Sequence, residues 1–271
     1  MRLDFRSGAA VALGYGAAMA IWMAASRIFP SLWPESPWIR FARPKLELLL
    51  ALVAAAVVFG FNILYHRGLR LPRSRREGLR PAVFIANVMI IWSPVALVLL
   101  ARRQGPATCL FASAGLPYKL AWGLLAAIAA TTLYSLVRHG RIEPGIFAWT
   151  FLRRRVWDLF QGAIQYFGFG FFVVRLDQVF GTLPTAVLCG ALYGAVKYPM
   201  LLRHYKLKTP QATGLVVFSA ALAAAGFLSV LFQRDLIVPS LVHSFMDRAQ
   251  GFRLREEEPV ARQQPLLRSS P

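Results

Sequence analysis

Three ionisable side chains in the second half of the chain could form a polar site in apolar surroundings. His243 and Asp247 are four residues apart in one apolar run, so they share a helix face. Lys197 lies near the end of an earlier run, four residues after Tyr193. An imidazole beside a carboxylate can move protons, and an ammonium can bind an anion. We predict that Lys197, His243 and Asp247 converge in one cavity, with Lys197 held charged by Asp247.

Each of these residues also has a structural interpretation. A single histidine in a membrane helix often packs against its neighbours, and a lysine near a helix end can extend its ammonium to the lipid headgroups.

Asp158 and Gln165 are seven residues apart in another apolar run, so both point the same way from one helix. No metal site is predicted, because zinc requires three protein ligands and His243 with Asp247 supplies two. No cofactor is predicted either.

The elements that must position these residues are membrane helices. The chain has 271 residues, of which 57% are hydrophobic and 16% charged, and its mean hydropathy is +0.50. A helix needs about 20 apolar residues to cross a hydrocarbon core about 30 Å thick. Seven runs have about this length, and an eighth, shorter run covers 235–247; the seven cover 8–29, 46–65, 82–101, 116–137, 157–174, 182–202 and 211–232. We predict an all-α polytopic membrane helix bundle of about eight transmembrane or partly inserted helices.

The net charge of +19 would suggest nucleic acid binding in a soluble protein. Here the basic residues lie between apolar runs, so they indicate topology, and no nucleic acid partner is expected. If the runs cross the membrane alternately, 21 lysines and arginines lie on one side and 7 on the other. This bias predicts that both termini are cytoplasmic, in what we expect to be a bacterial inner membrane. The first run is expected to be a signal-anchor helix rather than a cleaved signal peptide.

We divide the chain into an N-terminal four-helix membrane region (1–137), a membrane core (138–248) and a disordered cytoplasmic tail (249–271). Pro144 to Leu152 is apolar but too short to cross, and three arginines follow it. This segment is predicted either as an interfacial helix or as an ordinary basic loop. The tail has too little apolar surface to order itself.

Other notable residues are assigned structural roles. Glu47, Asn62 and Asn87 lie in or near spans of the first half. Cys109 and Cys189 form neither a CxxC motif nor a disulfide framework. Six glycines of the second half are expected to allow close helix packing: those at 162, 168, 170, 190, 194 and 226.

The last 110 or so residues resemble the CPBP intramembrane proteases, which include the CAAX prenyl endopeptidases and bacteriocin-processing enzymes. The segment from Arg234 to Asp247 is similar to the last motif of that family, H-x-x-x-N/D after a turn and a proline. The second motif, F-x-x-x-H, would correspond to Tyr193 to Lys197. The first, E-E-x-x-x-R followed by Gly, would fall near Ile164 to Gly170, with a register uncertainty of about one residue. The resemblance implies a CPBP-like core in the second half.

The chain departs from this family at the positions that would carry catalysis. In the family the motif glutamate is thought to activate a water, with histidines assisting it. Here Gln165 occupies the glutamate window, and Lys197 replaces the second-motif histidine, while His243 and Asp247 remain. An amide accepts no proton at neutral pH. Asp158 could act as a displaced carboxylate, although it lies about 10 Å further along the helix.

Three functions follow as hypotheses. The first is a non-catalytic protein of CPBP-like fold that binds a membrane protein, a membrane peptide or another substrate in the old catalytic cavity. The second is an active intramembrane endopeptidase that uses Asp158 or Asp247 with His243. The third is a small transporter, although no inverted repeat is apparent. The lipid bilayer is an expected partner in all three.

Overall fold

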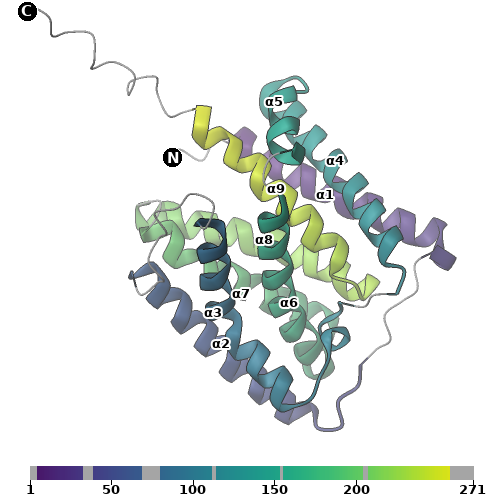
Figure 1. Cartoon of the computed structure of the whole chain (residues 1–271), viewed down its shortest axis with the longest axis vertical. Coiled ribbons are helices and arrows are strands. Elements are labelled where there is room, and N and C mark those ends of the chain that lie inside the picture. The colour runs from purple at the N-terminus through teal and green to yellow at the C-terminus, as the bar shows by residue number, and fades with distance from the viewer. Residues whose placement is uncertain are drawn as a thin grey trace, which may run out of the picture.

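The chain forms a helical bundle in a computed structural model that describes residues 5–32, 39–68, 80–111, 114–152, 155–203 and 207–256. All regular structure in these ranges is helical (Figure 1). The main helices are α1 (Phe5–Ile28), α2 (Pro44–His66), α3 (Arg80–Ala101), α4 (Leu116–His139), α6 (Arg155–Phe180), α7 (Thr182–Arg203), α8 (Thr209–Gln233) and α9 (Ile237–Glu256). This confirms the predicted all-α helix bundle.

Six of these helices are long and apolar enough to cross a membrane: α1, α2, α3, α4, α7 and α8. Large apolar side chains remain exposed along them, such as Leu100 on α3 and Leu183 on α7. In water such surfaces would be unfavourable, whereas lipid chains solvate them. The protein is therefore an integral membrane protein in contact with lipid.

Helix α6, the fifth predicted run, lies among the other helices and packs against α2, α3, α7 and α9. Every residue from 168 to 176 is buried, so this part of the helix is covered on all sides. Two glycines make the close packing possible. A side chain at Gly168 would collide with the Trp92 ring, and one at Gly170 with the Cys109 carbonyl.

Gly190 and Gly194 of α7 lie directly against α8. A methyl group at Gly194 would approach the Val216 carbonyl oxygen to 2.9 Å, and one at Gly190 would meet the Ala220 carbonyl. The predicted packing role of these two residues is thus confirmed. The same prediction is wrong for Gly226, because no atom lies within 4 Å of the position of its absent side chain. Gly226 instead borders a cavity that is described below.

A largely buried ionic network joins α2, α6 and the segment just after α3 at one end of the bundle. The Arg175 guanidinium donates to the Glu47 carboxylate, with Nε 3.1 Å from Oε2, and it lies over the Phe171 ring. The Arg102 Nε lies 2.9 Å from the other carboxylate oxygen, and Gln104 bonds to both Glu47 and Arg175. Glu47 and Arg175 are fully buried. The structural role predicted for Glu47 is therefore that of a counter-ion.

A second buried ion pair holds the start of α9. Lys119 of α4 pairs with Asp235 in the turn between α8 and α9, and both side chains are buried. The other Asp235 oxygen accepts a hydrogen bond from the Ile237 amide at 2.8 Å, which caps α9. The Leu236 amide donates to the Leu110 carbonyl at 3.1 Å. The orientation of α9 is thus determined by contacts with α4 and with the loop after α3.

The segment predicted as an interfacial helix or a basic loop is helical. It forms α5 (Pro144–Phe147) and a turn of π-helix, η4 (Ala148–Leu152). It also packs on the bundle, since Ile146 is buried and the Phe151 ring stacks on Phe245 of α9 at 4.8 Å. The side chains of the following arginines lie outside the described residues.

The division of the chain at residues 137 and 248 remains a prediction. Helices from both sides of residue 137 pack together. Helix α1 contacts α4, α8 and α9, and α4 contacts α9. Helix α9 continues to Glu256, beyond the predicted start of the tail at residue 249. Residues 257–271 of that tail lie outside the described residues.

Candidate functional site

A cavity of about 270 Å³ lies between α1, α7, α8 and α9. Tyr134 of α4 and Tyr166 of α6 also border it. Gly16 of α1 and Phe218 and Ala225 of α8 line it while being exposed themselves. The cavity is therefore open to the surface between α1 and α8. Both of these helices are long and apolar enough to cross a membrane, so the opening would face lipid.

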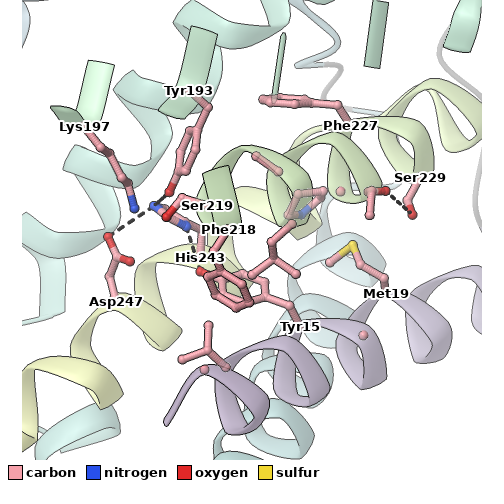
Figure 2. A pocket seen from close by; sticks show the side chains of 18 of the residues that line it. Tyr15, Met19, Tyr193, Lys197, Phe218, Ser219, Phe227, Ser229, His243 and Asp247 are labelled. Atoms are coloured by element: carbon pink, nitrogen blue, oxygen red, sulfur yellow. Dashed lines mark hydrogen bonds and ion pairs between the residues drawn. The ribbon is translucent and has the colours of Figure 1, made fainter. Parts of the chain in front are cut away.

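Lys197, His243 and Asp247 all line this cavity, and Figure 2 shows them pointing toward one another. His243 Nε2 lies 3.2 Å from Asp247 Oδ2. The Lys197 ammonium lies 4.5 Å from the centre of the Tyr193 ring, a cation–π contact, and its charge also acts on Asp247. His243 is buried, whereas the Asp247 side chain is 46% exposed. The direct partner of Asp247 is thus His243, with Lys197 as a further positive charge.

Tyrosines surround His243. The Tyr15 hydroxyl lies 2.8 Å from Nδ1, and the Tyr193 hydroxyl lies 3.4 Å from Nε2. The Tyr166 ring centre is 5.2 Å from that of His243. Tyr15 and Tyr166 were not predicted as site residues from the sequence. A tyrosine in the middle of an apolar run is the available signal, because its buried hydroxyl needs a hydrogen-bond partner.

These contacts determine how His243 can be protonated. Only a protonated Nε2 can donate to the Asp247 carboxylate, so a neutral imidazole has its lone pair on Nδ1. The Tyr15 hydroxyl is placed to donate to that lone pair. A hydrogen-bonded chain thus runs from Tyr15 through His243 to Asp247, and it occupies both ring nitrogens. A water molecule could be activated by His243 only after Tyr15 moves away.

The remaining candidate residues lie on α6. Gln165 is half-buried and is not one of the residues that line the cavity, whereas its neighbour Tyr166 is. The two differ by one position, or 100° around the helix. Asp158 belongs to α6, but its side chain lies outside the described residues. The structure therefore brings together Lys197, His243 and Asp247 in one cavity, and Gln165 is not among the residues that line it.

The cavity has a charged end and an apolar end. Lys197 and Asp247 lie at one end, and Met19 of α1 and Phe227 of α8 lie toward the other (Figure 2). Between these ends the walls consist mostly of apolar side chains and of glycines without a neighbour in contact, such as Gly16. An elongated apolar molecule with one polar group matches this distribution.

Among the described residues, no group of three or more histidine, cysteine, aspartate or glutamate side chains is placed to hold a metal ion. The cysteines are free and buried, and burial raises the pKa of the Cys109 thiol in the loop after α3 to about 11. Cys109 is therefore a poor nucleophile and a poor thiolate ligand.

No family model, curated protein or solved structure matches this chain.

Proposed function

We propose that this integral membrane protein binds a partner or substrate molecule from the membrane in the cavity and does not cut it, as a non-catalytic protein of CPBP-like fold. The observation that carries the proposal is the cavity between α1 and α8, with its apolar walls and its charged end. The residues of the last and second CPBP-like motifs, His243, Asp247 and Lys197, meet at that end. Their meeting supports a CPBP-like arrangement of α7 and α9.

Two features favour binding over catalysis. A neutral His243 has both ring nitrogens engaged, by Tyr15 and by Asp247. Gln165, in the window of the family's glutamate, has no basic site and does not line the cavity. Loss of a general base typically lowers a rate by about 10²–10⁴. Lys197 can stabilise an anion, but a charged lysine cannot activate water.

Photocrosslinking in cells with mass spectrometry of the adducts tests this function. Phe218 lines the cavity, and we replace it with the photocrosslinker benzoylphenylalanine. We expect this group to crosslink to a membrane molecule whose mass in the adduct is that of the intact, uncleaved molecule. The matched control is the same group at Phe232, which lies on α8, is exposed and does not line the cavity. Equal capture of the same molecules at both positions would contradict binding in the cavity.

The second candidate function is an intramembrane endopeptidase. It is favoured by the contact of 3.2 Å between His243 and Asp247, because a carboxylate can orient a histidine base. In the same experiment this function would give shortened peptides at Phe218. Their loss in His243→Ala or Asp158→Ala would establish proteolysis and refute the non-catalytic proposal.

We also propose that both termini face the cytoplasm of a bacterial inner membrane, from the distribution of basic residues. Ala42 and Arg67 lie at opposite ends of α2 and are exposed. Ala42→Cys is therefore expected to react with a membrane-impermeant maleimide in intact spheroplasts, and Arg67→Cys only after lysis. Both native cysteines are buried, so background labelling should be low. The reverse pattern would invert the topology, and labelling of both from one side would exclude it.

A further inference from the structure

We propose that the cavity binds a single-chain acidic lipid, with its carboxylate or phosphate at Lys197 and its chain between α1 and α8. This inference rests on the proposed function, since it names the ligand class for the same cavity. It depends on three observations: the length of the cavity, the chemistry of its walls, and the position of its one lysine.

The length of the cavity suits an extended acyl chain. The lining residues of α8 extend from Leu215 to Val230, which corresponds to about 22 Å along a helix. A leaflet contributes about 15 Å of hydrocarbon, so an acyl chain can extend fully within this length. The lining residues thus form an elongated channel along α8.

The walls favour an acyl chain over an extended peptide. They are built from side chains such as Met19, Leu222 and Phe227, with open space beside Gly16 and Gly226. An extended peptide would bring unpaired amide and carbonyl groups against this apolar surface, at a cost of several kcal/mol for each group. An acyl chain has no such groups, so it fits the wall without a hydrogen-bonding partner.

Lys197 determines the sign of the headgroup. Its ammonium lies on the face of the Tyr193 ring, a contact that leaves N–H groups able to donate toward an anion in the cavity. Asp247 is engaged by His243 Nε2, and Tyr15 is hydrogen-bonded on the other side of the imidazole. An acid at Lys197 would thus gain a charge-assisted hydrogen bond, while Asp247 keeps its partner.

The test uses protein in phosphatidylcholine nanodiscs, with cis-parinaric acid as a fluorescent fatty acid and its methyl ester as the neutral counterpart. Lys197→Gln should weaken binding of the acid about tenfold and change binding of the ester much less, because only the acid loses an ionic partner. Gly226→Leu should weaken both probes at least tenfold by filling the channel. Since no atom lies within 4 Å of that position, the larger side chain should not disturb the fold.

Gly214→Leu is the matched control. Gly214 is on α8, also has no atom within 4 Å, and does not line the cavity, so binding should be unchanged. Gly16→Leu repeats the block from α1 if Gly226→Leu unfolds. Displacement of the probe by oleate, by oleoyl lysophosphatidate, or by both identifies the acid source and supports the inference.

Three results would overturn this inference. The first is unchanged probe binding in both Gly226→Leu and Gly16→Leu. The second is an equal effect of Lys197→Gln on binding of the acid and of the ester. The third is no displacement of the probe by either natural acid. Capture of an intact peptide at Phe218, together with no acid binding, would reject the lipid while supporting the proposed function. Absence of both would reject both.

Discussion

Glu47→Ala is expected to destabilise the folded protein by about 3–5 kcal/mol, because it leaves the Arg175 guanidinium buried without its counter-ion. Arg175 is held by Glu47, by Gln104 and by a carbonyl of its own helix, and only Glu47 carries an opposite charge in this network. Equilibrium unfolding in mixed micelles, followed by circular dichroism, measures the loss.

The matched control for this prediction is Glu143→Ala. Glu143 pairs with Arg141 at 3.0 Å, but the Arg141 side chain is 76% exposed, so the pair should contribute only about 0–1 kcal/mol. A double change of Glu47 and Arg175 to methionine should be less damaging than Glu47→Ala, because no charge is left unpaired. If Glu47→Ala proves as mild as Glu143→Ala, the buried network does not stabilise the fold as described.

Lys119→Met is expected to cause a loss of similar size, about 3–5 kcal/mol, by leaving Asp235 charged and buried. Adding Asp235→Asn should recover much of it. The asparagine is neutral, and its side-chain oxygen can still accept the Ile237 amide that begins α9. The same unfolding measurement compares the single and the double variant.

This second prediction also concerns the cavity, because α9 carries His243 and Asp247 on the turns that follow. The single variant should reduce capture at Phe218, and the double variant should restore it. A double variant less stable than Lys119→Met would show that the charges of Lys119 and Asp235 are not coupled in the way their contact implies.

The helices could be predicted from the sequence because a membrane allows few alternatives. The run at 182–202 became α7, Thr182–Arg203, and the run at 211–232 became α8, Thr209–Gln233. In hydrocarbon each backbone amide must be hydrogen-bonded within its own segment, so an apolar run of about 20 residues forms a helix. The packing role of Gly190 and Gly194 was predictable for a similar local reason, since a pair of glycines four residues apart leaves a flat helix face.

The incorrect prediction and the contacts that were not predicted both depend on which atoms of other helices face a given residue. Gly190 and Gly226 are the same residue type in apolar runs, yet one faces the Ala220 carbonyl and the other faces the open cavity. The Tyr15 contact with His243 joins residues 228 positions apart. No local pattern encodes such a distance, so the tyrosines could be recognised only as buried hydroxyls in need of partners.

Sequence alone therefore determined that this is a helical membrane protein and roughly where its apolar helices lie. It also determined that Lys197, His243 and Asp247 are costly groups in need of partners. Those properties depend on composition and on spacing within one helix, where the solvent and the helical repeat act on neighbours in the chain. Tertiary structure decided that α6 is surrounded by other helices and that Glu47 is the counter-ion of Arg175. It also decided that Tyr15, and not Gln165, is hydrogen-bonded to His243. Such choices depend on the rotation of each helix about its axis, which is set by packing against helices distant in sequence.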